Sequence, residues 1–308
     1  MHDVVPRGFA AYARVFHPAV RERPVGRSWP TEGDATAWEA FLAERPDVDA
    51  ERVTWAGVAA AFGRVMHPLA QWNRLVGADD PYGGGAPRDA AGWRYEAPQE
   101  GRLEPGELVA LAQILQPRTT TPDAGGIAVW EGWGGLVGAE IDQTPTGLFT
   151  VGMPRRYAEY SESDQTVDAR HRSVLYRSLK DVFNNPFRKP VWRTGVLSND
   201  ISRGPRLELP HRGHVLFQGG VAEFADPDWV MRVPWRDMTT VGWPDPPSPS
   251  IIWPDDHAWA MVTEIDADST IVAGDIELIE AIVADPRLEA ASLPADAALS
   301  SDADEVNR

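Results

Sequence analysis

The sequence predicts an α+β fold, a mixed and mainly antiparallel sheet flanked by helices and joined by long Pro/Gly-rich loops. Hydrophobic residues make up 43% of the 308 residues, which is enough for a sizeable core. Segments with strand character and segments with helical spacing follow one another irregularly, without the strand–helix–strand repetition of a parallel sheet. Glycine and proline are abundant and concentrate in the stretches between these segments.

A first strand is expected over residues 8–17, which carry aromatic and β-branched side chains and stop before Pro18. A helix should follow Asp34, because an aspartate at this position can cap the first turn. The apolar residues at helical spacing in this helix are Trp38, Phe41 and Leu42.

Two further helices are expected over 51–65 and 104–117. The second has Pro105 in its first turn, where a missing N–H does no harm, and Pro117 at its end. Between the two helices, residues 77–101 are rich in Gly, Pro and Asp and should form a long loop.

Short strands and two helices are expected in the rest of the chain. The stretch 243–254, "WPDPPSPSIIWP", has five prolines and must be extended. The expected strands lie at 125–135, where one enters a Gly-rich turn, and near 190–197, 206–210, 214–218 and 257–266, and the expected helices lie at 168–183 and 275–285.

These elements predict one globular α+β domain over residues 1–290, with a possible subdomain break near 142–165. The remaining residues, 291–308, are small and acidic. They are expected to form a disordered tail.

The formal net charge of −17 disfavours nucleic acid and anionic lipid as partners, because affinity for phosphates rests largely on Lys and Arg. A small molecule or a basic protein suits this charge better. The chain has no cysteine, which excludes disulfides, thiolate nucleophiles and Cys-ligated zinc. No stretch approaches the ~18 apolar residues of a membrane span, and no signal-peptide pattern is present, so we expect a soluble, cytoplasmic protein.

The stretch "EIDADSTIVAG" (264–274) is the most suggestive of chemistry. Asp266, Asp268 and Thr270 match the Asp-x-Asp-x-Thr pattern of haloacid-dehalogenase-like phosphatases, in which the first Asp attacks phosphorus. That chemistry also needs a downstream lysine, and none follows Asp268. The same aspartates fit the first positions of a calcium loop, but Ile271 stands where that loop needs Gly.

A simpler interpretation uses strand geometry alone. Alternate residues of a strand share a face, so Glu264, Asp266 and Asp268 would project together with neighbours ~7 Å apart. They would form either a solvated strand end or the acidic floor of a pocket. In the second case these three, with His257, are candidate catalytic residues, and Asp266 and Asp268 could hold a divalent cation. Otherwise no metal and no cofactor is expected.

Two segments combine indole rings with carboxylates. A flat apolar ring beside carboxylates and an imidazole suits a sugar, a nucleoside or a cationic group, whereas the common alternative is packing in the core. The candidate ligand-binding residues are Trp253, Asp255, Asp256, His257 and Trp259 in one segment and Trp130, Glu131 and Trp133 in the other. Thirteen tryptophans are many for one chain, so some are expected to be exposed.

The other motifs are weak. His211 and His214 have a spacing seen among metal ligands, but zinc needs at least three protein ligands and no third is specified nearby. The patterns HExxH, Walker A, GxGxxG and GxSxG are absent.

The stretches "GFAAYARVFHPA" and "SIIWPDDHAWAMVTEID", with "IVAG" and "ADPRLEA" after them, resemble a group of uncharacterised proteins from high-GC actinobacteria. The resemblance covers the two ends of the chain and not its middle. It implies a bacterial cytoplasmic protein and carries over no catalytic residue.

Three functions are compatible with these observations. The first is a non-catalytic binding or interaction protein that uses the loops 130–133 and 253–268. The second is a hydrolase with a carboxylate pair on the strand 260–268, with or without a divalent cation. The third is a structural subunit of a larger assembly, which would expose a contiguous apolar patch.

Overall fold

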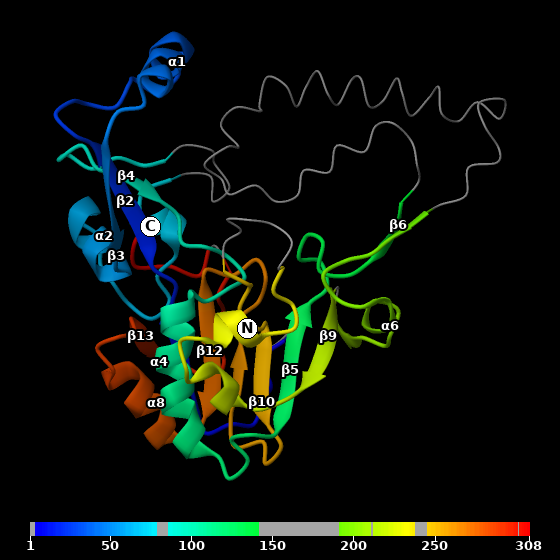
Figure 1. The fold of residues 1–308 in the computed structure, drawn as a ribbon. Coiled ribbons are helices and arrows are strands. Elements are labelled where there is room, and N and C mark those ends of the chain that lie inside the picture. Colours follow the sequence, from blue (N-terminus) through cyan, green and yellow to red (C-terminus); the bar gives the residue numbers. More distant parts are fainter. Residues whose placement is uncertain (1–3, 79–85, 142–190, 211, 238–244, 301) are drawn as a thin grey trace. The chain divides into compact units, whose positions relative to one another are not determined.

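A computed structural model describes residues 4–78, 86–141, 191–210, 212–237, 245–300 and 302–308 (Figure 1). The chain divides into two compact units, where the sequence predicted one domain over 1–290. The first unit comprises Met1–Trp130, Leu207–Arg232 and Pro247–Arg308, and the second comprises Glu131–Arg206 and Val233–Pro246. The break expected near 142–165 lies outside the described residues, as does the helix expected over 168–183.

The α+β prediction is confirmed by an eight-stranded antiparallel sheet in the first unit. Its strand order is β13-β1-β12-β11-β10-β5-β9-β8. The strands are β1 (Ala11–Phe16), β5 (Gly125–Trp130), β8 (Leu207–Leu209), β9 (Arg212–Gln218), β10 (Ile251–Pro254), β11 (Ala260–Val262), β12 (Ser269–Gly274) and β13 (Ala290–Leu293). Strands from the two ends of the sequence therefore lie side by side.

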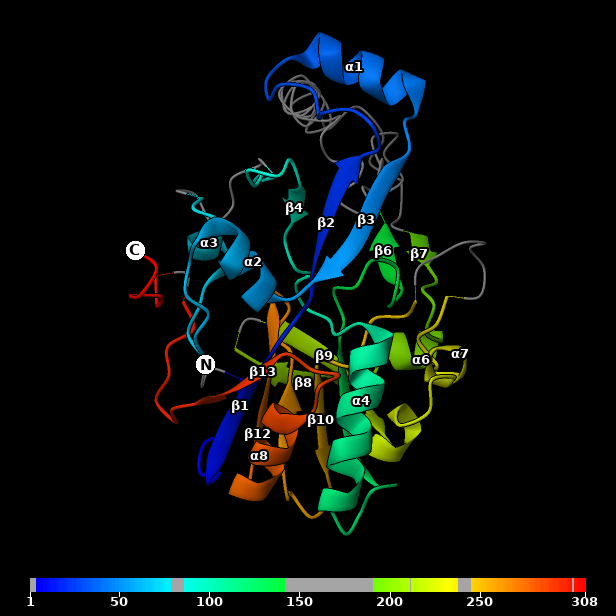
Figure 2. The ribbon, with the colours of Figure 1, turned by 90° about the vertical axis from the view of Figure 1, so that its left-hand side faces the viewer.

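Two helices pack side by side on this sheet, α4 (Pro105–Leu115) and α8 (Ile276–Ala284) (Figures 1 and 2). Both were expected. Pro105 occupies the first turn of α4, and the Asp275 carboxylate caps α8 by accepting a hydrogen bond from the Leu278 amide at 2.7 Å. Two short helical turns contact α4, η1 (Gln116–Arg118) and η3 (Val221–Phe224), and α7 (Trp229–Arg232) packs on η3 through Trp229 and Phe224.

A smaller three-stranded sheet has the order β3-β2-β4. Its elements are β2 (Ala19–Pro24), α1 (Ala35–Glu44), β3 (Val48–Val53), α2 (Trp55–Phe62), α3 (Trp72–Leu75) and β4 (Arg94–Glu96). Figure 2 shows β2 and β3 as a long hairpin that carries α1 at its far end. A second hydrophobic core, which includes Phe16, Trp55, Leu75 and Tyr95, lies beside these elements.

Two helix predictions in this region need correction. Asp34 caps α1 as expected, with the Ala37 amide 3.0 Å from its carboxylate, but Leu42 is 52% exposed and only Phe41 is buried. The helix expected over 51–65 begins only at Trp55, because Thr54 caps it and the preceding residues belong to β3.

The second unit contains β6 (Ala139–Ile141), β7 (Val191–Arg193) and α6 (Asn199–Ser202) in its described part. β6 and β7 form a two-stranded antiparallel sheet. Across both units, the described residues include no helix with the length and apolar character that crossing a bilayer requires.

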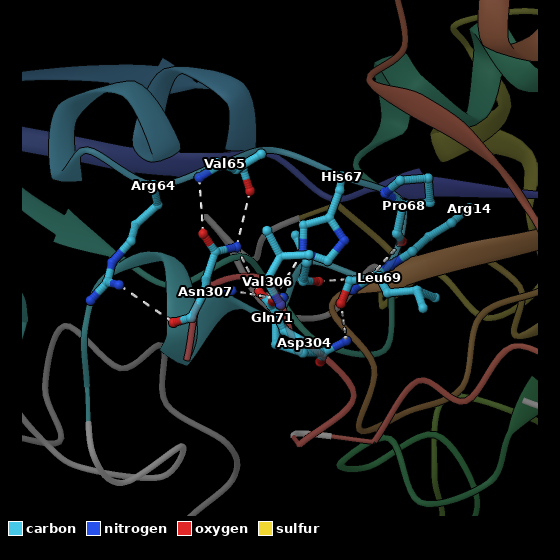
Figure 3. A network of polar contacts seen from close by, with 11 residues as sticks. Arg14, Arg64, Val65, His67, Pro68, Leu69, Gln71, Asp304, Val306 and Asn307 are labelled. Carbon is cyan, nitrogen blue, oxygen red and sulfur yellow. Dashed lines mark hydrogen bonds and ion pairs between the residues drawn. The ribbon is translucent and has the colours of Figure 1, made fainter.

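The prediction of a disordered tail over 291–308 is wrong. Ala290–Leu293 form β13, and Asp304, farther along, is fully buried (0% exposed). Its carboxylate accepts hydrogen bonds from the Gln71 amide at 3.2 Å and from the Asn307 amide at 2.9 Å, and it contacts the His67 ring nitrogen at 2.8 Å. Figure 3 shows these residues around the carboxylate. The composition of the tail predicted that Asp304 is exposed to solvent, but its carboxylate holds the C-terminal segment to the loop of His67 and Gln71. We call this set of hydrogen bonds the C-terminal anchor.

Candidate ligand-binding site

The acidic stretch forms a turn, which overturns the prediction of a strand reaching Asp268. β11 ends at Val262 and β12 begins at Ser269. The Ala267 amide donates a hydrogen bond to the Glu264 carbonyl at 3.0 Å, and the Asp266 amide donates to the Glu264 carboxylate at 2.7 Å. Glu264, Asp266 and Asp268 therefore do not share a strand face, because these local hydrogen bonds bend the backbone between them.

Arginines neutralise each of the three carboxylates. Arg212 of β9 forms ion pairs with Glu264 at 2.7 Å and with Asp266, so these two residues are brought together. Asp268 pairs instead with Arg14 of β1 at 3.1 Å. The carboxylates thus tie neighbouring segments of the first unit to one another.

Thr270, the last residue of the phosphatase-like pattern, is buried in the core. Its hydroxyl lies 3.0 Å from His17 Nε2 and 2.7 Å from the Thr263 hydroxyl. Glu264 borders a cavity of about 10 Å³ together with Arg212, which leaves room for about one water molecule and not for a substrate.

No group of three or more His, Asp or Glu side chains that could hold a metal ion occurs among the described residues. His214 is buried on β9, and His211 lies outside the part of the chain that the structure describes.

Two of the predicted ligand-binding indoles belong to the core. Trp259 is 1% exposed, just before β11. Trp253 on β10 is half-buried, and a Cβ on Gly126 of the paired strand β5 would collide with its indole ring. The burial of Trp259 leaves no face for the ligand stacking predicted for it, whereas the half-buried ring of Trp253 packs against the core of the sheet.

The other tryptophan segment is divided between the units. Trp130 ends β5 in the first unit, where the Arg212 guanidinium lies 5.6 Å from its ring. Glu131 and Trp133 belong to the second unit, in which Glu131 forms an ion pair with Arg206 at 2.7 Å.

The connection between β10 and β11 contains the remaining candidates, and Asp256 fixes its conformation. The carboxylate accepts hydrogen bonds from the Thr119 hydroxyl at 2.8 Å, from the Thr120 amide at 2.6 Å and from the Ala258 amide at 3.1 Å. Partial removal from water raises the pKa of Asp256, but these bonds outweigh it and bring the pKa down to about 2. Asp256 is therefore a structural clamp, while Asp255 is exposed beside it.

His257 has an unusual backbone conformation for a residue with a side chain. Its φ is +54°, in the left-handed region, and its amide donates to the Pro254 carbonyl at 3.0 Å. Few residues other than glycine adopt this region, although Asn, Asp and His do so more often than most.

The strand register brings His257 to a cleft. Ala11 of β1 pairs with Gly274 of β12, and Ala260 of β11 pairs with Ala273, so the start of β1, the end of β12 and the start of β11 meet at one edge of the sheet. The residues at and just beyond these strand ends line an open cleft of about 420 Å³. They are Arg7, Gly8, Phe9, Ala10, His257, Ala258, Gly274 and Asp275.

Two side chains in this cleft have no partner among the residues that the structure describes. Arg7 and His257 are exposed, and neither side chain forms a hydrogen bond or ion pair with the described part of the chain. Arg7 is nevertheless on a fixed segment, because Val5 is buried and the Tyr12 hydroxyl donates to the Pro6 carbonyl at 3.2 Å. Sequence reasoning identified His257 but missed Arg7 and Asp275 as cleft residues, since only the strand register brings these distant positions together.

The sequence also gave no sign of a buried polar group at His17. Its Nδ1–H donates to the Gln99 carbonyl at 2.7 Å, and its Nε2 accepts from the Thr270 hydroxyl. Burial, the largest effect, lowers the pKa of His17 from 6.5 to about 4, so the ring is neutral at pH 7.

This lowered pKa predicts acid sensitivity. The unfolded chain binds a proton at His17 more readily than the folded chain between pH 6.5 and pH 4, so stability falls with pH through this window. We expect His17 to account for a loss of about 2 kcal/mol in the free energy of unfolding between pH 7 and pH 5. Urea unfolding of the native protein and of H17N at both pH values measures this. H17N should be less stable than the native protein at pH 7, but its free energy of unfolding should fall less between pH 7 and pH 5. An equal fall in both proteins contradicts the prediction.

Comparison with models of known protein families, with curated proteins and with solved structures found no match. The function must therefore be inferred from the cleft and its side chains.

Proposed function

We propose that the protein is a non-catalytic binding protein, and that a small molecule binds in the cleft formed by residues 7–10, 257–258 and 274–275. The observation that carries the proposal is that Arg7 and His257, which have no partner in the described part of the chain, line the same cleft. Exposed polar groups that face a cleft without a protein partner are available to fix the orientation of a ligand.

The backbone at His257 supports the same proposal. Holding a residue with a side chain at a φ of +54° costs roughly 1 kcal/mol, and residues in such conformations cluster at ligand-binding sites. Asp256 holds the turn by hydrogen bonds with Thr119 and Thr120, so the backbone that bears the His257 imidazole has a fixed position.

The ion pairs of the acidic turn argue against the hydrolase alternative. A pair of catalytic carboxylates needs a substrate or a water molecule between its members, which requires separations of ~5–10 Å with open space. Here Arg212 stands between Glu264 and Asp266, and Arg14 engages Asp268.

The proposal is tested by thermal unfolding of the purified protein with nucleotides, sugars, carboxylic acids, amino acids, phosphate and divalent cations. A compound that binds only the folded state at a hundred times its dissociation constant adds about 2.7 kcal/mol of stability. We expect such a shift in the native protein and in D255N, and its loss in H257N. Asparagine tolerates the left-handed conformation, so H257N removes the imidazole and keeps the turn, and Asp255 is a control on the same turn outside the cleft lining.

A shift that survives in H257N would place the ligand elsewhere. If no compound shifts the midpoint, the small-molecule proposal fails, and the basic protein partner that the charge of −17 favours takes precedence.

A further inference from the structure

We infer that the ligand of this cleft is a zwitterion, a small molecule with a carboxylate and an ammonium group close together, as in a free α-amino acid. The inference rests on the proposed function and adds the chemical class of the ligand. It is drawn from the charged residues that line the cleft, Arg7 and Asp275, and from the absence of an ion pair between them.

The cleft is lined by one cation and one carboxylate, Arg7 and Asp275. They form no ion pair with each other, and Arg7 forms none with any other described residue. The guanidinium of Arg7 is thus available for a ligand carboxylate, which it can bind through two parallel hydrogen bonds.

Asp275 has a free oxygen as well. One oxygen, Oδ1, accepts the hydrogen bond from the Leu278 amide that caps α8. The other makes no hydrogen bond within the described residues, so it can accept one from a ligand ammonium group. The capping bond fixes the side chain of Asp275, a residue that lines the cleft.

Opposite charges in one cleft discriminate between classes of ligand. A simple anion gains the attraction of Arg7 but suffers repulsion from Asp275, and a simple cation meets the reverse. An uncharged sugar would leave both charges without a partner. A ligand with both charges can pair with both side chains. Because such a ligand is neutral overall, the net charge of the protein does not change on binding.

The rest of the lining fits a small apolar substituent. Phe9, Ala10 and Ala258 are the apolar side chains of the cleft, and the backbone of Gly8 is open beside them, with no other atom within 4 Å of where a Cβ would lie. A ring and two methyl groups suit the side chain of an amino acid better than the large polar surface of a nucleotide. His257 can donate a hydrogen bond to the ligand carboxylate or accept one from its ammonium group.

The test begins with the twenty common amino acids, each added at 10 mM in thermal unfolding. The one that raises the midpoint most is then compared, by isothermal titration calorimetry, with its N-acetyl derivative and its amide. The first derivative lacks the ammonium group and the second lacks the carboxylate. We expect each derivative to bind the native protein at least tenfold more weakly than the parent amino acid.

Two variants assign the charges to their partners. R7Q should weaken the parent amino acid at least tenfold and leave the amide unaffected, because the amide has no carboxylate to lose. D275N should weaken the parent at least tenfold and leave the N-acetyl derivative unaffected. Asparagine caps helices as well as aspartate does, so D275N keeps α8 in place, and D255N serves as the control with unchanged binding.

The inference is overturned if no amino acid shifts the midpoint, if the N-acetyl derivative or the amide binds as tightly as the parent, or if D255N weakens binding as much as D275N. Its failure is separable from that of the proposed function. If a compound that is not a zwitterion shifts the midpoint and the shift is lost in H257N, the cleft remains a binding site. Only the inference that its ligand is a zwitterion is then overturned.

Discussion

Replacing Arg14 by methionine is expected to lower the free energy of unfolding by about 3–5 kcal/mol, the range seen when one member of a buried ion pair is removed. Arg14 is 1% exposed. It donates hydrogen bonds to Asp268 at 3.1 Å and to Ser269 at 2.9 Å, and also to the Ala70 carbonyl at 2.7 Å. Methionine fills a similar volume but leaves these oxygens without a donor, and unsatisfied buried acceptors are costly.

Burial lowers the pKa of Arg14, and the neighbouring Asp268 offsets this effect. The side chain therefore remains a charged group that joins β1, β12 and the loop at Ala70. The measurement is urea unfolding of R14M at pH 7, followed by tryptophan fluorescence.

R212M is the matched control for R14M. Arg212 also pairs with acidic residues of the 264–268 turn, but it is 27% exposed and its partner Asp266 is largely in solvent. Exposed ion pairs contribute little, so we expect a loss of under about 1 kcal/mol. Equal losses in R14M and R212M would contradict the role assigned to Arg14.

Replacing Asp304 by alanine is expected to cost about 3 kcal/mol and to release the C-terminal anchor. The carboxylate accepts bonds from the Gln71 amide and from both the backbone amide and the side-chain amide of Asn307, besides its contact with His67. Hydrogen bonds to a charged acceptor contribute more than neutral ones, and the remaining donors would be left buried. These bonds lower the pKa of Asp304 although burial, the largest single effect, raises it.

A local readout distinguishes loss of the anchor from general destabilisation. The Val65 amide donates to the Asn307 side chain at 2.9 Å, so its hydrogen exchange should accelerate in D304A. Asp302, which is exposed in the same segment and accepts a hydrogen bond from the Ser300 hydroxyl, provides the control: D302A should leave the stability and the exchange at Val65 almost unchanged. Unchanged exchange at Val65 in D304A would refute the anchor.

The sequence predicted the features that depend on neighbouring residues. The capping of α1 by Asp34 and the start of α4 at Pro105 were confirmed, because such signals act within one helical turn. The same local reasoning failed at 264–268. The alternation of side chains along a strand was extended through residues that form hydrogen bonds with one another in a turn.

Features that depend on distant residues could not be predicted. The anchor at Asp304 requires the loop at His67 and Gln71, and the cleft requires the register of β1 against β12. Composition suggested that the C-terminal segment with Asp304 is disordered, and it gave no indication of the cleft. His257 was identified for its residue type and its neighbours, and not for the cleft in which it lies.

The placement of β1 in the sheet also constrains how the protein folds during synthesis. β1 pairs with β12 on one side and β13 on the other, and the bond from Arg14 to Ser269 joins residues 255 positions apart. A ribosome adds about 5–20 residues per second, so β1 waits roughly 10–50 s for its partners to be made. Through that interval its apolar side chains, Tyr12, Val15 and Phe16, are without their final neighbours in the sheet. Because these contacts join distant parts of the chain, closure of the sheet is expected to be a late and slow step of folding.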